Sequence, residues 1–394
     1  MARGRMLRAI FSRLAIAAAL LWLAPSHGSA QWIGDSDLES HIRRGIEFVY
    51  NLSFDSARLE FKQVVRSYPD HPAGHFFLAT VEWWNILIDI DNTSNDEKFL
   101  SLLDNVIVLC DQRLDKDEHD VAAMFFKGGA LGFQGRLYGN REDWVKAANA
   151  GRQALSIVQQ AHKLAPENND ILLGIGIYNY YAEVVPEKYP FVKPLMVFFP
   201  KGDKQKGINQ LRTASEKAGY ADIEATYFLL QLFQNFEGRF PEALSLALRL
   251  NKRFPRNPMF HRYVGRCYAS MGQWDDMQKT FLEITGRVRE HRLGYTSAVE
   301  REATYYAGLY EFNRGKYDDA LTHFYRCDEL SRTLDKEQRS GFWVLALLRM
   351  GMIYDIQGKR SAAIEQYNKV MEMPDYGDAH DQARRYLKTA YARS

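Results

Sequence analysis

Apolar residues along the chain recur at the spacing of amphipathic helices, and polar stretches that contain glycine separate them. Four of these stretches align with one another: GRFPEALSLAL from Gly238, GQWDDMQKTFL from Gly272, GKYDDALTHFY from Gly315 and GKRSAAIEQYN from Gly358. The glycines lie 34, 43 and 43 residues apart. Five positions after each glycine comes an alanine or a methionine, and nine positions after it comes an alanine or an aromatic residue. The spacing predicts a repeated pair of antiparallel helices joined by a glycine turn.

The first helix of each later pair carries a second glycine, seven residues before the turn, at Gly265, Gly308 and Gly351. Small residues at these positions let two helices approach closely, and the aromatic residue of the second helix fills the space against the next pair. This pattern resembles the tetratricopeptide repeat (TPR), a helix-turn-helix unit of 34 residues. The resemblance implies an all-α, TPR-like superhelical solenoid of antiparallel helix pairs with a C-terminal cap helix.

The repeat extends toward the N-terminus, because an alanine and a proline twelve residues apart close earlier pairs as well. These residues are Ala57 and Pro69, Ala154 and Pro166, and Ala243 and Pro255. We therefore expect a single domain over residues 31–394. Its helix pairs are expected at 38–71, 72–115, 119–168, 170–219, 224–257, 258–286, 301–332 and 344–374, with the cap at 378–393.

An apolar insert, residues 184–201, separates the two helices of the fourth predicted pair. Its centre, YPFVKPLMVFFP over residues 189–200, contains prolines that prevent a long helix, and it is too short to cross a bilayer. An apolar segment needs cover, so we expect this one to pack as a wedge in the groove of the solenoid or against a neighbouring repeat.

The sequence on both sides of this insert, GIGIYNYY from Gly174 and KGDKQKGINQL from Lys201, resembles the tetratricopeptide repeat 39 family. The resemblance is centred on residues 170–214. It implies an interaction protein of the same architecture that has no catalytic site.

The first thirty residues have the pattern of a secretory signal peptide. Four arginines precede the apolar run LAIAAALLWLA, residues 14–24, and a small-residue cleavage site ends at Ala30. We expect residues 1–30 to be removed and the protein to be exported, so that it is periplasmic, envelope-associated or secreted. The alternative is a retained N-terminal anchor, although eleven apolar residues are too few to span a membrane.

The charge balance argues against nucleic acid as a partner. The whole chain carries a formal charge of +2, and the first thirty residues contribute four arginines and no acidic residue, so the remainder carries −2. A nearly neutral chain without basic runs lacks the electrostatic footprint of a nucleic-acid-binding protein.

No motif in the sequence indicates an enzyme, a cofactor or a metal site. The sequence has no GxSxG motif, and Gly174 and Gly176 lack the third glycine of a dinucleotide-binding loop. Cys110, Cys267 and Cys327 fit no metal or redox spacing. We expect buried free thiols, with a bridge between Cys267 and Cys327 as the alternative.

The remaining candidate is the concave groove, which the first helix of each TPR-like pair lines. The groove positions of the repeat correspond to Phe228, Leu232, Asn235, Arg262, Arg266, Tyr305, Leu309, Phe312, Leu348, Met352 and Asp355. Aromatic residues beside two arginines suit a peptide that carries an acidic group. The alternative is that these aromatic residues only pack the superhelix.

Together these patterns predict a non-catalytic scaffold that binds a protein or peptide partner in the groove. They predict no nucleic-acid partner and no integral membrane span in the mature chain. The alternative function is a carrier of a small apolar ligand or lipid, with residues 189–200 lining its cavity. The oligomeric state does not follow from the sequence.

Overall fold

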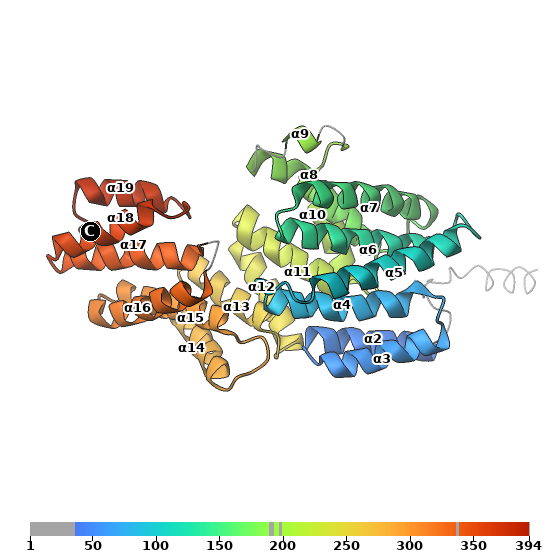
Figure 1. Cartoon of the computed structure of the whole chain (residues 1–394), viewed down its shortest axis with the longest axis horizontal. Coiled ribbons are helices and arrows are strands. Elements are labelled where there is room, and N and C mark those ends of the chain that lie inside the picture. Colours follow the sequence, from blue (N-terminus) through green and yellow to red (C-terminus); the bar gives the residue numbers. More distant parts are fainter. Residues whose placement is uncertain (1–35, 189–192, 197–198, 336–338, 394) are drawn as a thin grey trace, which may run out of the picture.

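The computed structural model describes residues 36–188, 193–196, 199–335 and 339–393, and all of its regular elements are helices (Figure 1). Antiparallel pairs follow one another along the chain. They are α2 (Ser36–Tyr50) with α3 (Phe54–Ser67), α4 (Pro72–Ile88) with α5 (Asp96–Leu114), α6 (Val121–Asn140) with α7 (Trp144–Leu164), α8 (Leu172–Lys188) with α10 (Lys204–Lys217), α11 (Asp222–Leu232) with α12 (Phe240–Arg253), α13 (Pro258–Ser270) with α14 (Trp274–Arg289), α15 (Ser297–Asn313) with α16 (Tyr317–Leu334), and α17 (Gly341–Ile356) with α18 (Arg360–Met371).

Three further elements complete the described chain. The single turn α9 (Lys193–Met196) lies between α8 and α10, the π-helical turn η2 (Phe233–Glu237) continues α11, and α19 (Ala379–Lys388) follows the last pair. The predicted fold class, an all-α TPR-like solenoid, is confirmed. The expected signal peptide, residues 1–30, lies outside the described residues.

The four aligned glycines end the first helix of a pair in a left-handed conformation. Their φ angles are 63° at Gly238, 68° at Gly272, 75° at Gly315 and 70° at Gly358. Side chains of L-residues rarely adopt this conformation, and glycine adopts it without steric cost. The turn therefore depends on local sequence, which is why its position was predictable.

The second glycine of each later pair receives an aromatic ring from the facing helix. A Cβ atom built on Gly308 would lie 2.7 Å from the ring of Phe324, and one on Gly265 would lie 2.6 Å from the ring of Phe281. The Phe281 ring also stacks on Tyr306 of the next pair, with the centroids 4.4 Å apart. Each ring thus fixes the spacing between the two helices of its own pair, and the Phe281 ring also contacts the next helix pair.

The N-terminal body, α2 to α13, is closed on itself. Tyr50 at the end of α2 packs against Trp84 of α4 and Phe254 after α12, with ring centroids 5.0 and 5.4 Å away. Its carbonyl oxygen accepts a hydrogen bond from Asn257 Nδ2 at 2.9 Å, and its hydroxyl donates to Glu224 Oε2 at 2.9 Å. One hydrophobic core consequently runs from α2 to α13. In Figure 1 the blue α2 and α3 end beside the yellow segment between α12 and α13.

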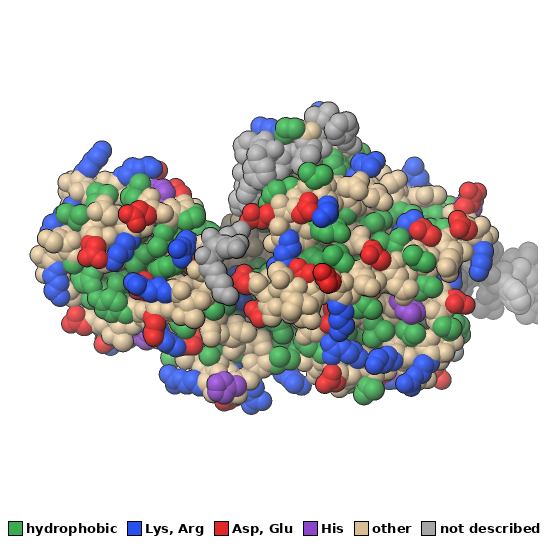
Figure 2. Space-filling view, in the orientation of Figure 1, with side chains coloured by type: hydrophobic (Ala, Val, Ile, Leu, Met, Phe, Trp, Pro, Cys, Tyr) green, Lys and Arg blue, Asp and Glu red, His purple; other side chains and the backbone are tan. Residues whose placement is uncertain are grey.

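The C-terminal lobe, α15 to α19, has a separate hydrophobic core that extends from Tyr305 to Tyr386. A smaller cluster around Phe281 and Val299 lies between the two cores. Figure 2 shows the surface hollowed between this lobe and the N-terminal body. The solenoid thus consists of two packed parts with a narrow connection at α14 and α15.

The cap helix α19 covers the end of the lobe, with Ala379, Ala383 and Tyr386 buried beneath it. The segment after it crosses the ends of the preceding helices. Tyr391 N donates a hydrogen bond to Asp355 Oδ2 at 2.8 Å, and Arg393 donates to the carbonyl oxygen of Asn313 at 2.7 Å. The C-terminal residues therefore hold the last two repeats together. In the part of the chain that is described, no helix combines the length and the apolar character needed to cross a membrane.

Candidate functional site

Most of the side chains predicted to line the groove are buried in the structure. The buried ones are Phe228, Leu232, Tyr305, Phe312, Leu348 and Met352, each no more than 6% exposed. Asn235 is exposed, whereas Arg262, Arg266 and Leu309 are partly exposed. The proposed surface is therefore narrower than the sequence indicated. A residue from a helix distant in sequence covers Phe228, whereas Tyr305 and Phe312 pack against neighbouring helices of the same lobe.

Phe228 is buried because the closed N-terminal body fills the inner side of α11. The guanidinium carbon of Arg136, from α6, lies 4.6 Å from the centroid of Phe228 and 4.7 Å from that of Trp83 on α4. Arg136 also forms an ion pair with Glu224, whose carboxylate is almost completely buried. This arginine joins three inner helices and occupies the space that an open groove would provide there. Nothing in its local sequence distinguished it from a surface arginine.

Asp355, another predicted groove residue, is used inside the C-terminal lobe. Its carboxylate accepts hydrogen bonds from Arg360 at 2.9 Å, from the Tyr367 hydroxyl at 2.9 Å and from Tyr391 N at 2.8 Å. The side chain has no exposed area. Because its oxygen atoms already have these donors, Asp355 holds the cap in place and is not free to meet a partner.

Arg262 and Arg266 come together on one carboxylate, that of Glu302. Arg262 Nε lies 2.6 Å from Glu302 Oε2, and Arg266 donates to the same oxygen atom at 2.7 Å. The Glu302 side chain is fully buried, whereas the arginines keep 18% and 24% of their side-chain surface exposed. Two guanidinium groups against one carboxylate leave one net positive charge at this position.

The electrostatics of the cluster follow from this geometry. Burial opposes the ionisation of Glu302, but the charges of Arg262 and Arg266 outweigh that effect and lower its pKa to about 2. Glu302 is therefore an anion at every physiological pH. Its charge is fully engaged by the two arginines, and an approaching anion meets the exposed edges of their guanidinium groups.

A third arginine, Arg349 on α17, was not among the predicted residues. Its guanidinium carbon lies 5.6 Å from the ring centroid of Phe312, and its NH1 donates to the sulfur of Met352 at 3.2 Å. Its Nε is buried and has no hydrogen-bond partner among the described residues. The signal available in the sequence was a single arginine inside the apolar run FWVLALLRMGMIY.

A chain of contacts connects these groups across successive repeats. Asn235 Nδ2 approaches the Tyr263 hydroxyl at 3.5 Å, and the guanidinium carbon of Arg266 lies 5.3 Å from the Tyr263 ring. On α15 the rings of Tyr305 and Tyr306 are 5.3 Å apart. We call the solvent-accessible part of this arrangement the inner surface. It consists of Asn235, Arg262, Arg266, Leu309 and Arg349, with Glu302 beneath them.

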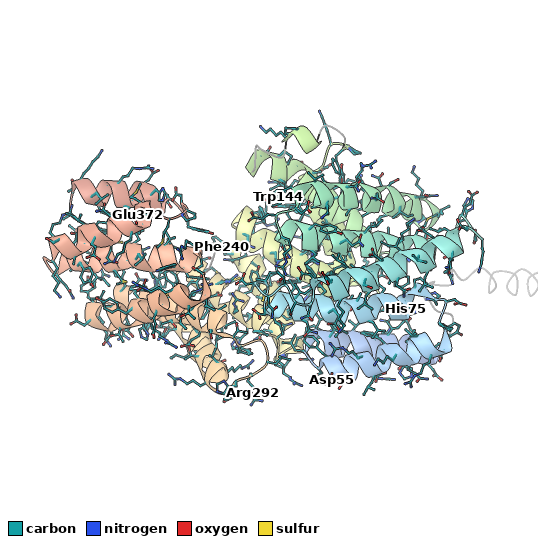
Figure 3. The ribbon with its side chains drawn as sticks, in the orientation of Figure 1. Asp55, His75, Trp144, Phe240, Arg292 and Glu372 are labelled. Carbon is teal, nitrogen blue, oxygen red and sulfur yellow. The ribbon has the colours of Figure 1, made fainter. Side chains whose placement is uncertain are left out.

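Figure 3 labels residues in both parts of the solenoid. Phe240, the first residue of α12, is labelled in Figure 3. It belongs to the N-terminal body and lies at the edge of the hollow. Glu372, labelled in the same view, follows α18 on the side of the C-terminal lobe.

The apolar insert is described only at its two ends and at α9. Phe199 stacks on Tyr178 of α8, with centroids 6.4 Å apart, and Asp203 N donates to the carbonyl oxygen of Asn179 at 3.0 Å. A Cβ atom on Gly202 would lie 2.6 Å from the α8 backbone, so only glycine fits this approach. Residues 189–192 and 197–198 lie outside the described residues, and the wedge expected there stays a prediction.

Metal-ligating groups and reactive thiols are two kinds of site to look for among the described side chains. Among them, no group of three or more His, Cys, Asp or Glu residues is placed to hold a metal ion. Cys110, Cys267 and Cys327 are free and buried, and burial raises the pKa of each thiol to about 12. Thiols with such pKa values are protonated and poor nucleophiles at neutral pH.

Comparison with known proteins identifies no family for this chain. No protein-family model matches it, and no curated protein sequence matches it. A solved structure of a human IFIT1 dimer with m7Gppp-AAAA is 13% identical over 91% of this chain and 88% of the other, with a TM-score of 0.44. A Rap protein complexed with competence and sporulation factor is 10% identical over 90% of this chain and 97% of the other, also with a TM-score of 0.44. At these values the similarity carries no argument about what this chain binds.

Proposed function

We propose that this protein is a non-catalytic scaffold that binds a protein or peptide partner on its inner surface. The observation that carries the proposal is the cluster of Arg262 and Arg266 over Glu302, beside apolar side chains on α15. Charged edges next to apolar contacts can fix both the position and the orientation of a peptide chain. The closed N-terminal body supplies a rigid support, which lowers the entropic cost of binding.

The proposal includes export of the protein and excludes nucleic acid as its partner. Both parts rest on the sequence: the N-terminal segment resembles a signal peptide, and the remainder of the chain carries a formal charge of −2. A scaffold outside the cytoplasm would meet envelope or secreted proteins. Binding of RNA or DNA by the mature protein would contradict this part of the proposal.

Site-specific photo-crosslinking in the cells of origin tests the proposal. A photoreactive benzoylphenylalanine replaces Leu309, which is partly exposed on the inner surface, and in a control protein it replaces Leu282, which is 59% exposed on α14. We expect one protein to crosslink at position 309 and not at position 282, with unchanged helical circular dichroism. Equal crosslinking at both positions, or no crosslinking at position 309, would remove the inner surface as the binding site.

The second candidate is a carrier of an apolar ligand or lipid. It is favoured by the partly exposed Phe199, which stacks on Tyr178 at the end of the apolar insert. Native mass spectrometry of the purified protein distinguishes the two functions, because a carrier retains a bound apolar molecule. The same measurement on a variant with residues 189–200 replaced by a Gly/Ser linker shows whether the insert holds that molecule.

A further inference from the structure

We propose that Arg349 is the residue of the inner surface that recognises an acidic side chain of a peptide partner through a salt bridge. This inference rests on the proposed function and names the chemistry of its partner: an extended peptide segment in which an Asp or Glu is flanked by apolar residues.

The first argument is the poor hydrogen bonding of the Arg349 guanidinium. Its described polar neighbours are the Met352 sulfur, 3.2 Å from NH1, and the Tyr305 hydroxyl. Thioether sulfur is a weak acceptor, and the buried Nε has no partner among the described residues. No carboxylate of the described residues lies within 4.0 Å of this guanidinium.

Three other partly buried or buried arginines of the molecule have a carboxylate in place, whereas Arg287 donates instead to the Pro255 carbonyl oxygen and the Tyr295 hydroxyl. Arg136 pairs with Glu224, Arg301 pairs with Asp335, and Arg360 pairs with Asp355. Partial burial of a guanidinium is costly unless an anion and hydrogen-bond acceptors compensate for the lost water. Among the described residues no carboxylate compensates Arg349 for this cost, and a carboxylate from a bound peptide would supply the compensation.

The second argument is the local charge balance. Glu302 is fully engaged by Arg262 and Arg266, so it is not available to Arg349. Three guanidinium groups and one carboxylate leave two net positive charges on the inner surface. An anionic partner group is thus attracted to this region, while Arg349 has the most unused donor capacity of the three.

The third argument concerns the neighbours of the charge. The Phe312 ring and Met352 contact Arg349, and the partly exposed Leu309 packs against the same apolar cluster. A carboxylate bound there is shielded from water, which strengthens a bidentate pair with a guanidinium. Apolar residues before and after the acidic residue of the peptide would contact the partly exposed Leu309. This combination suits a peptide better than a nucleic-acid backbone, whose successive phosphates need a longer basic track.

A selection experiment with a random-peptide phage library tests the inference. The library is selected in parallel on the wild-type chain, on Arg349→Met, and on Arg289→Met, a control in which an exposed arginine of α14 is changed. We expect the wild type and the control to select peptides that share an Asp or Glu flanked by apolar residues. Affinity of a selected peptide should fall about tenfold to a hundredfold with Arg349→Met, and similarly when its acidic residue becomes an amide.

A stability measurement separates recognition from a structural role. Methionine keeps the aliphatic contacts of Arg349 with Phe312 and removes the uncompensated charge, so the melting temperature of Arg349→Met should stay equal or rise. A clear fall in melting temperature would show that Arg349 is needed for packing and would overturn the inference.

The other outcomes are equally decisive. Selected peptides that share no acidic residue, or that bind Arg349→Met as well as the wild type, overturn the inference but leave the binding scaffold intact. Selection of no peptide at all counts against both the inference and the proposed binding scaffold. Binding of a single-stranded RNA probe that depends on Arg349 would replace the peptide with a nucleic acid.

Discussion

Arg262 on α13 donates a hydrogen bond to the buried carboxylate of Glu302 on α15, across a distance of 2.6 Å. The two helices belong to successive repeats at the narrow connection between the N-terminal body and the C-terminal lobe. The contact therefore has two roles, because it joins the two parts of the solenoid and it sets the charge of the inner surface.

Replacing Glu302 should test the structural role. Glu302→Ala leaves Arg262 and Arg266 without their buried counter-ion, so we expect the free energy of unfolding to fall by about 3–5 kcal/mol. Urea denaturation followed by circular dichroism measures this change. Glu365→Ala is the control, because Glu365 forms an exposed pair with Lys369 and the loss of a solvent-screened pair should change stability little. Similar effects of the two substitutions would contradict the importance of the buried cluster.

Stability should depend on pH through His261 of α13, which is buried. Its Nδ1 lies 3.1 Å from the Tyr295 hydroxyl, and its Nε2 lies 3.7 Å from Glu283. Burial, with a smaller contribution from the charge of Arg287, lowers its pKa from 6.5 to about 4. The folded state therefore binds fewer protons than the unfolded state between these values, and stability is complete above pH 6.5 and falls as the pH decreases toward 4.

The size of this pH effect is roughly 3 kcal/mol at most. His261→Gln should reduce the slope of unfolding free energy against pH between pH 6.5 and 4.5, as measured by urea titrations across that range. Glu302 titrates lower, with a pKa of about 2 in the folded state, so its contribution is lost only below the ordinary glutamate range near 4.5. An unchanged slope in His261→Gln would assign the pH dependence to other groups.

Glycine substitutions should separate close packing from helix propensity. Gly308→Ala places a methyl group 2.7 Å from the Phe324 ring, so we expect a loss of about 1–3 kcal/mol from overpacking. Gly132→Ala, inside α6, meets no atom within 4 Å and should stabilise the protein by about 0.5–1 kcal/mol. Thermal unfolding of both variants provides the comparison. A stabilised Gly308→Ala would mean that the rings do not define the spacing of the pair.

The register of the repeat was predictable because its signals are local. The turn at Gly315, the close approach at Gly308 and the ring of Phe324 lie within seventeen residues, and each has a direct steric meaning. The closure of the N-terminal body was not predictable in this way. It depends on the curvature that accumulates over several repeats, which brings Tyr50 to Asn257 although 207 residues separate them.

The candidate site was likewise predictable only in part. The repeat pattern identified the inner helices and drew attention to Arg262 and Arg266, but it gave no information on whether a position was open or covered. Phe228 is covered by Arg136, whose approach depends on the packing of α6 against α11. Arg349 does not occupy one of the groove positions of the repeat, and it is distinguished in the structure by a buried Nε without a hydrogen-bond partner among the described residues.

Removing residues 389–394 should loosen the C-terminal lobe. The buried Asp355 would lose the hydrogen bond from Tyr391 N, and α15 would lose the contacts of Arg393 with its last carbonyl groups. The loss of one hydrogen bond to a charged group costs about 1.5–3 kcal/mol, so amide hydrogen exchange in α17, α18 and α19 should become faster, with little change in α2 to α6. Full-length Thr389→Ala, which alters an exposed side chain of the same segment, is the control. Equal exchange rates in the truncated and control proteins would show that the segment contributes nothing to the lobe.

The contact between Tyr50 and Asn257 also imposes an order on biosynthesis. In an open repeat array each unit can fold as soon as its neighbour has been made. Here the first repeat cannot form its contact with Asn257 until the ribosome has added the 207 residues that separate the two partners. At ordinary elongation rates that takes roughly ten to forty seconds. During this interval the apolar side of the nascent N-terminal repeat is accessible to chaperones, before the chain can close.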